Sequence, residues 1–261
     1  MSEALPARLR LMTWNIHGGI GPDGRFDLDR IAALIARHRP DILALQEIDT
    51  RGRGVECLAP LQGLGIGHRA EARTIAVPDG HYGHVLFSRW PTRDTVLHDL
   101  SVHRREPRIA IDTRIETPQG GLRLVAVHLG LALLERRRQA HALARLARAG
   151  NGTPTVMMGD FNDWFSFRLV RRALAPVLAE RAAPRSFPAR WPALRLDRVY
   201  CSHAGMLADS FTDAQGRHAS DHLPVIADIA IPPAPSPAGP RAAPEQASSP
   251  HVDPVQQGGR P

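Results

Sequence analysis

The chain has 261 residues, a formal net charge of +7 and a hydrophobic content of 43%, which is enough for one large folded domain with a buried core. All of its cationic residues are arginines, a pattern typical both of GC-rich codon bias and of an electropositive surface for phosphate-bearing substrates. With only two cysteines the chain lacks a disulfide framework, so its stability must come from the core. It shows no secretory signal and no apolar run of about eighteen residues, so we expect a cytoplasmic monomer without a transmembrane segment.

Apolar runs and turn signals predict the elements in chain order. Residues 8–16 are expected to form a buried strand that ends in a turn at Gly18 and Gly19. Asp27 is expected to cap a helix that runs to about Arg37, and further helices are expected over residues 133–148 and after Phe165. The other predicted strands cover residues 42–48, 85–88, 109–116, 122–129, 155–159, 196–202 and 224–231.

Many strands and few helices predict an α+β fold, a four-layer α/β/β/α sandwich of two packed mixed β-sheets flanked by helices. We expect one catalytic domain over residues 1–231. Residues 232–261 are rich in Pro, Ala and Ser and carry almost no large apolar side chains, so they are predicted to be a disordered tail.

Glu47 lies at the end of the apolar strand predicted over residues 42–48. A carboxylate at that position is costly unless it is solvated, paired or bound to a metal. Glu47 is therefore a candidate oxygen ligand for Mg²⁺, and an exposed strand-end glutamate is the alternative.

Asp160 and Asn162 lie two residues apart after Gly159, so in an extended segment their side chains would face the same way. A carboxylate and an amide together suit a phosphate oxygen and the water that attacks it. A turn rich in Asp and Asn is the alternative for this motif taken alone.

Histidines also stand at strand ends. His222 has the right type of side chain to exchange a proton near neutrality, and it needs a carboxylate to hold its ring. Its neighbour Asp221 would point the other way on a strand, so Asp197, at the start of another strand, is the better partner. His128 and Asn15 have the same placement at the ends of apolar runs.

Any one of these motifs is weak, but as a set, in this order, they resemble the endonuclease/exonuclease/phosphatase superfamily over residues 9–231. The resemblance is carried by Trp14-Asn15-Ile16, Gln46-Glu47, Tyr82-Gly83, Ser88-Arg89, Pro107-Arg108, His128-Leu129, Gly159-Asp160-Phe161-Asn162, Leu196-Asp197-Arg198 and Ser220-Asp221-His222-Leu223-Pro224. One departure is Gly83-His84, where many relatives have Gly-Asn.

The resemblance implies roles for individual residues. It implies that Glu47, with Asn15 and Asp221 near it, holds Mg²⁺ or Mn²⁺. It implies that Asp160 and Asn162 position or activate the attacking water, with Asn162 and Arg108 contacting the substrate phosphate. His222, held by Asp197, and His128 resemble the catalytic histidines. Either His222 or Asp160 could be the general base, and we favour His222.

The expected function is a Mg²⁺-dependent phosphoesterase that cleaves a phosphodiester by in-line attack of water, with nucleic acid as first-choice substrate. A phospholipid or small phosphoester substrate is the alternative, and a non-catalytic binding protein that kept the fold is an alternative of another class. The Val-His-Leu sequence around His128 argues against an abasic-site endonuclease.

Two further groups of side chains follow these motifs in the sequence. Trp164 and Phe165 follow the Asp160 motif, and we expect core packing rather than stacking on a substrate. Arg136, Arg137 and Arg138 are consecutive on a predicted helix and cannot share one face, so we expect them to lie on the solvated surface.

Overall fold

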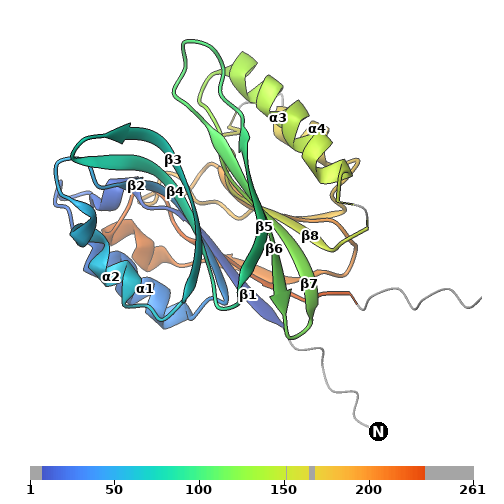
Figure 1. Cartoon of the computed structure of the whole chain (residues 1–261), viewed down its shortest axis with the longest axis horizontal. Helices are drawn as coiled ribbons and strands as arrows, with labels where there is room; N and C mark the ends of the chain where they lie inside the picture. The colour runs from blue at the N-terminus through green and yellow to red at the C-terminus, as the bar shows by residue number, and fades with distance from the viewer. Residues whose placement is uncertain (1–7, 151, 165–167, 233–261) are drawn as a thin grey trace, which may run out of the picture.

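The structure, a computed structural model, describes residues 8–150, 152–164 and 168–232. Two six-stranded sheets pack face to face, with helices on their outer sides (Figure 1). The first sheet has the order β11 (Leu207–Thr212), β12 (Val225–Ile229), β1 (Leu9–Asn15), β2 (Ile42–Asp49), β4 (Gly80–Ser88) and β3 (His68–Val77). The second has the order β5 (Thr92–Asp99), β6 (Ile109–Thr117), β7 (Gly120–His128), β8 (Thr155–Asp160), β10 (Asp197–Cys201) and β9 (Glu180–Ala182).

Both sheets are mixed. Strand β1 runs parallel to β2, and β7 runs parallel to β8, while the other pairs are antiparallel. The predicted four-layer sandwich of two mixed sheets is therefore confirmed.

Alternation along the central strands builds the layers, because successive side chains point to opposite faces of a sheet. In β1, Leu9 and Leu11 enter the core between the two sheets, whereas Met12 and Trp14 pack under the helices. These central strands are apolar on both faces, which is why they read as continuous apolar runs in the sequence.

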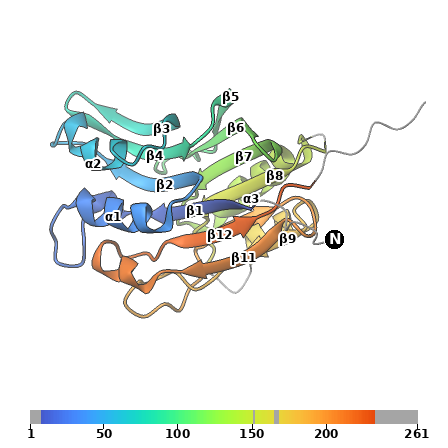
Figure 2. The same ribbon diagram turned by 90° about the horizontal axis from the view of Figure 1, so that it is seen from below.

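The helical layers cover the outer faces (Figure 2). Helices α1 (Leu28–His38) and α2 (Ala59–Gln62) lie on the first sheet, and α3 (Leu133–Arg148) and α4 (Leu169–Leu174) lie on the second. As predicted, the Asp27 side chain caps α1 by accepting hydrogen bonds from the backbone N–H groups of Asp29 and Arg30. Short 3₁₀ helices cover His17–Gly19, Val55–Leu58 and Ala214–His218.

The strands that the sequence did not predict are β3, β5, β9 and β11. All four lie at the sheet edges in the described chain, and β3 and β5 carry mostly exposed or half-buried side chains. They therefore lack the apolar runs by which the central strands were found. The predicted tail, residues 232–261, lies outside the described residues except for its first position.

The expectation for Arg136 was wrong. Its side chain is fully buried on α3 and donates hydrogen bonds to the backbone carbonyls of Gly130 and Leu131, so it fixes the turn that follows β7. Arg137 and Arg138 are exposed, as expected. In the part of the chain that the structure describes, no helix has the length and apolar character needed to cross a membrane.

Candidate active site

The strand order gathers the predicted residues at one edge of the sandwich. Strands β1, β7 and β8 end there at Asn15, His128 and Asp160, and the antiparallel β10 begins there at Asp197. In register, Asp160 stands opposite His128 on one side and opposite Asp197 on the other. Polar side chains that are up to about two hundred positions apart in the chain thus meet at one place.

A cavity of about 360 Å³ lies at this edge, which we call the polar cavity. All but one of the predicted site residues line it, namely Asn15, Glu47, Arg108, His128, Asp160, Asn162, Asp221 and His222. The exception is Asp197, which is fully buried behind His222.

The backbone beside Asp160 is tightly packed. At Gly159, where φ is +147°, a Cβ atom would lie 1.9 Å from the carbonyl oxygen of Val127 on the adjacent strand. Only glycine allows this approach of β8 to β7, and the approach sets the position of Asp160 beside His128.

The expected extended geometry of Asp160 and Asn162 is wrong. The strand ends at Asp160, whose carboxylate accepts a hydrogen bond of 2.8 Å from the backbone N–H of Asn162, and Asn162 has a left-handed φ of +49°. The Asn162 side chain in turn donates to the carbonyl of Leu129 at 2.9 Å. Both side chains reach the polar cavity because the chain turns there, and asparagine tolerates that left-handed backbone.

His222 and Asp197 form the pair that the sequence predicted. Nδ1 of His222 lies 2.8 Å from a carboxylate oxygen of Asp197, and Nε2 points toward Asp160 at 3.9 Å. Burial disfavours the charged ring, but the carboxylates of Asp197, Asp160 and Asp221 outweigh it and raise the pKa of His222 to about 10. Burial and the Asp197 charge raise the pKa of Asp160 to about 6, against the opposing effect of the His222 cation.

His128 is held by Arg108. A guanidinium nitrogen of Arg108 lies 2.9 Å from Nδ1 of His128. Burial, and then the positive charge of Arg108, hold the pKa of His128 well below its ordinary value. His84, the departure from the family pattern, is also buried, and mainly for that reason its pKa falls to about 4. Nε2 of His128 faces Glu47 and Asp160, at 3.8 Å from each.

Glu47 reaches the cavity through a backbone irregularity. The register between β2 and β4 shifts between Gln46 and Ile48, and Glu47 itself has a left-handed φ of +60°. A left-handed backbone is uncommon for glutamate and stores strain. Strained positions of this kind cluster at functional sites. The bulge turns the carboxylate of Glu47 out of the strand and toward Asn15.

The carboxylates around the cavity form a set that a hard divalent cation would bind. The Asn15 amide nitrogen donates to Glu47 at 2.8 Å and to Asp160 at 3.1 Å, which holds two negative groups close together. Nδ1 of His17 lies 3.7 Å from both Glu47 and Asp221, which face it from different elements. Partly exposed oxygen ligands around a polar cavity suit Mg²⁺ or Mn²⁺, which keep several waters.

A second group, Asp160, Asp197 and His222, also has ligand atoms within 4.8 Å of one another. Nδ1 of His222 is already engaged by Asp197, and the raised pKa of His222 keeps its ring positive near neutrality. All three side chains are buried, whereas Mg²⁺ keeps several waters, so this group fits proton transfer better than the binding of a hydrated ion.

Several residues of the site were not singled out from the sequence. His17, Tyr82, Glu106 and Phe187 line the polar cavity. The sequence carried a partial signal for Tyr82, which stands in the Tyr82-Gly83 motif, whereas Glu106 and Phe187 lie in loops without one. Trp164 also lines the cavity and is 42% exposed, so its expected core packing is wrong, and Phe165 lies outside the described residues.

Two motif residues support the site from behind. Nε1 of Trp14 donates to the backbone carbonyl of His222 at 2.8 Å. The Ser220 hydroxyl donates to the carbonyl of Asn15 and accepts from the N–H of His222. These bonds fix the loop that carries His222 against the end of β1.

Comparisons with known proteins agree with this geometry. The family model described as "Endonuclease/Exonuclease/phosphatase family" matches residues 12–222. The uncharacterized protein YbhP of Escherichia coli (strain K12) is 31% identical over 251 residues, which cover 84% of this chain and 95% of YbhP.

Solved structures share the fold. An endonuclease/exonuclease/phosphatase from Beutenbergia cavernae superposes with a TM-score of 0.71 at 23% identity, covering 86% of this chain and 72% of its own. The human nocturnin catalytic domain gives a TM-score of 0.65 at 21% identity, covering 87% of this chain and 94% of its own. With a family match over most of its length, the chain belongs to the endonuclease/exonuclease/phosphatase family.

Proposed function

We propose that this protein is a divalent-metal-dependent hydrolase that cleaves a phosphodiester by in-line attack of water, with nucleic acid as its first-choice substrate. The observation that carries the proposal is the buried Asp197–His222–Asp160 network opening onto the same cavity as Glu47 and Asp221. Acid/base groups and metal ligands at one cavity are what hydrolysis of a phosphate ester requires.

Glu47 and Asp221 would hold the metal, Mg²⁺ or Mn²⁺, with Asn15 keeping Glu47 in place. When bound, the metal polarises a phosphoryl oxygen and stabilises the charge on the leaving oxygen. The carboxylates of Glu47 and Asp221, which face His17 from two different elements, supply the negative charge that such an ion needs.

Asp160 is proposed to accept the proton of the attacking water. Its raised pKa makes it a stronger base than an ordinary aspartate while it remains ionised above about pH 6. Asn162, fixed by its bonds to Asp160 and Leu129, would position that water and contact the scissile phosphate. This assignment differs from the sequence-based preference for His222 as general base.

His222 is proposed to act as a charged donor. Because the negative charge of Asp197 keeps His222 protonated near neutrality, its Nε2–H can stabilise charge that develops on the phosphoryl oxygens. His128 supplies a neutral donor on the other side of Asp160, and Arg108, which was expected to clamp the phosphate, lines the cavity beside it.

A substrate panel with Mg²⁺ or Mn²⁺ tests the proposal. It contains single- and double-stranded DNA, RNA, bis(4-nitrophenyl) phosphate, 4-nitrophenyl phosphate and a phospholipid set. We expect nucleic acid and the small diester to be cleaved, and the cleavage to be lost in Glu47→Ala and His222→Ala.

Each other result has a definite meaning. Cleavage of the phospholipids alone would support the lipid alternative in place of nucleic acid. No cleavage of any substrate would support a non-catalytic binding protein and overturn the proposal. Activity that survives in both variants would identify a contaminating nuclease.

A further inference from the structure

A second cavity, of about 510 Å³, lies directly beside the polar cavity. We call it the arginine cavity, because its lining includes six arginines: Arg168, Arg171, Arg181, Arg185, Arg195 and Arg198. They come from α4 and its N-cap residue, from β9, from β10 and from the segment that joins β9 to β10. Neither the sequence motifs nor the proposed hydrolysis assigns a role to these residues.

The charge of this cavity is largely uncompensated. Asp163 is the one carboxylate among its described lining residues, and it is paired with Arg198 at 2.8 Å. Among the described residues, no carboxylate lies within ion-pair distance of the other five arginines. Six cations and one anion around one cavity give a formal charge of +5, which favours the binding of an anion there.

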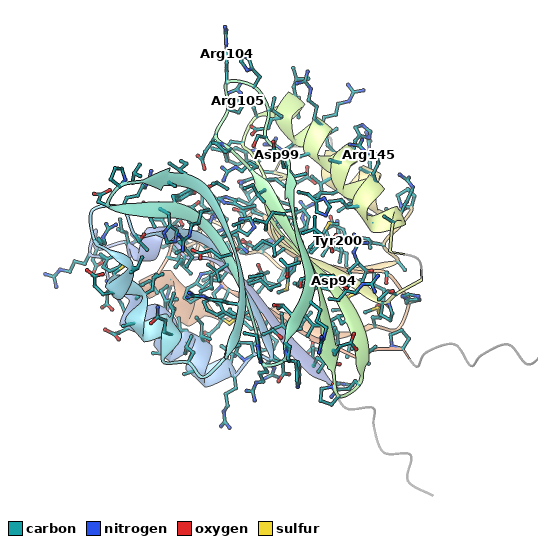
Figure 3. The ribbon with its side chains drawn as sticks, in the orientation of Figure 1. Asp94, Asp99, Arg104, Arg105, Arg145 and Tyr200 are labelled. Carbon is teal, nitrogen blue, oxygen red and sulfur yellow. The ribbon has the colours of Figure 1, made fainter. Side chains whose placement is uncertain are left out.

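Buried, hydrogen-bonded side chains form the floor of the cavity. Arg198 is only 5% exposed and is held by Asp163, the backbone carbonyl of Arg195 and the hydroxyl of Tyr200. Tyr200 lies inside the molecule, on the side of the second sheet that α3 covers (Figure 3). Arg195 donates to the carbonyl of Ala183, which ties the two ends of the β9–β10 segment together.

Like charges face one another across this floor. Burial lowers the pKa of Arg181, and the positive charges of Arg198 and Arg171 lower it further. Guanidinium groups that converge on a cavity without counter-charges match phosphate, which they bind through paired N–H donors.

The same two chain segments line both cavities, with neighbouring residues on opposite sides. Asn162 and Leu196 line the polar cavity, and their neighbours Asp163 and Arg195 line the arginine cavity. Trp164 lines both cavities. A molecule whose scissile phosphate lies beside Asn162 can therefore extend past Trp164 into the arginine cavity.

We propose that the arginine cavity binds non-scissile phosphate groups of a single-stranded nucleic acid whose scissile phosphodiester lies in the polar cavity. The inference rests on the proposed function and narrows its substrate class. A flexible single strand bends into a concave site at little cost, whereas a stiff duplex must be deformed to do so. Trp164 is 42% exposed and lines both cavities, and an aromatic side chain between two phosphate sites suits a strand whose bases are unpaired.

Binding without hydrolysis tests this inference. A fluorescent single-stranded oligonucleotide of about eight nucleotides is titrated with protein in EDTA, and anisotropy is recorded at several salt concentrations. The test variant is Arg171→Gln with Arg185→Gln, both exposed in the arginine cavity. The matched control is Arg145→Gln with Arg148→Gln, which removes the same charge from the exposed surface of α3, where Figure 3 labels Arg145.

We expect the dissociation constant of the test variant to rise about tenfold or more, and that of the control to rise less than about threefold. The dependence of log Kd on log salt should become shallower by roughly 1.4 in the test variant, because about two phosphate contacts are lost. Thermal melting verifies that both variants are folded.

Three results would overturn the inference. The first is an equal loss in both variants, which would reflect overall charge. The second is an unchanged dissociation constant in the test variant. The third is that a duplex of the same length, or inositol hexakisphosphate, binds the wild-type protein as tightly as the single strand and is weakened to the same extent by the test substitutions.

The outcome is separable from that of the proposed function. Binding in EDTA needs no catalysis. If the wild-type protein cleaves no substrate, but the test variant binds the oligonucleotide more weakly, the proposed hydrolysis is refuted and the proposed phosphate binding in the arginine cavity is supported. A protein that cleaves phosphodiesters but shows one of the three results above would do the reverse.

Discussion

The guanidinium of Arg108 donates a hydrogen bond of 2.9 Å to Nδ1 of His128. Since arginine has no acceptor, Nδ1 must carry the lone pair, and a neutral His128 ring must carry its proton on Nε2. That N–H points into the cavity, toward Glu47 and Asp160. Arg108 thus acts as a positioning residue that makes His128 a neutral donor.

Replacing Arg108 should allow the neutral His128 ring to populate both tautomers. Arg108→Lys keeps the positive charge but loses the planar donor that meets Nδ1. We expect kcat to fall roughly 10- to 100-fold, with nitrogen NMR of the His128 ring showing a mixture of tautomers. A ring that stays fully protonated on Nε2 in the variant would contradict the positioning role.

Asp197→Asn should remove the negative charge that stabilises the protonated ring of His222. The pKa of His222 is expected to fall from about 10 toward the ordinary value, because the largest stabilising charge is gone, and proton NMR of the ring measures this shift. We expect kcat to fall by about 10²- to 10⁴-fold. If the two residues act together, the double variant Asp197→Asn/His222→Gln should have a kcat only slightly below that of His222→Gln alone. A kcat that falls by the product of the two single losses would show that they act independently.

Glu47→Gln should weaken metal binding without weakening the fold. In wild-type protein, Mg²⁺ at a hundred times its dissociation constant should raise the unfolding free energy by about 2.7 kcal/mol. The variant should gain much less, while in EDTA it should match or exceed the wild-type stability, because one of several crowded carboxylates is neutralised. Glu116→Gln, exposed on β6, is the control and should respond to Mg²⁺ as wild type does. Equal Mg²⁺ stabilisation of all three proteins would place the metal elsewhere.

Arg10 and Asp228 make stability depend on pH. They stand opposite each other on β1 and β12 and form a bidentate pair with both distances at 2.8 Å, and this bond holds the pKa of Asp228 below its ordinary value. A depressed pKa stabilises the fold above the unfolded-state pKa, and the effect is lost as the pH falls through the folded-state value.

Because Arg10 is partly exposed, we expect Asp228→Asn to cost only about 1 kcal/mol of unfolding free energy at pH 7. The difference from wild type should shrink as the pH falls below the ordinary pKa of an aspartate, and it should vanish once the carboxyl of Asp228 is protonated in the folded protein, because aspartic acid and asparagine are then both uncharged. Urea unfolding across this range measures it, and a difference that does not change with pH would mean that packing, rather than charge, is lost.

Gly159→Ala should strongly destabilise the fold. The new Cβ would meet the Val127 carbonyl at 1.9 Å, so β7 and β8 must separate, and we expect a loss of about 2–4 kcal/mol in unfolding free energy together with loss of activity. Gly205→Ala is the control, because Gly205 also has a positive φ of +82° but nothing lies within 4 Å of its Cβ position. That variant should lose only about 1 kcal/mol, and equal losses would attribute the effect to φ instead of the close approach.

The sequence by itself determined the elements that bury apolar side chains. The helix predicted over residues 133–148 is α3, Leu133–Arg148, because its period of apolar residues is local information. The central strands β1, β2, β7 and β8 were found within about two residues of their ends, since both of their faces are apolar. Their order, with polar motifs at their ends, also predicted which residues line one cavity.

The tertiary structure decided what depends on distant neighbours. The edge strands β3 and β5 owe their conformation to pairing with β4 and β6, not to their own apolar content. Arg136 is buried because the carbonyls of the turn after β7 accept hydrogen bonds from its guanidinium. The arginine cavity has the same origin, since four separate segments bring its charges together, and no local pattern in a sequence encodes a distance between segments.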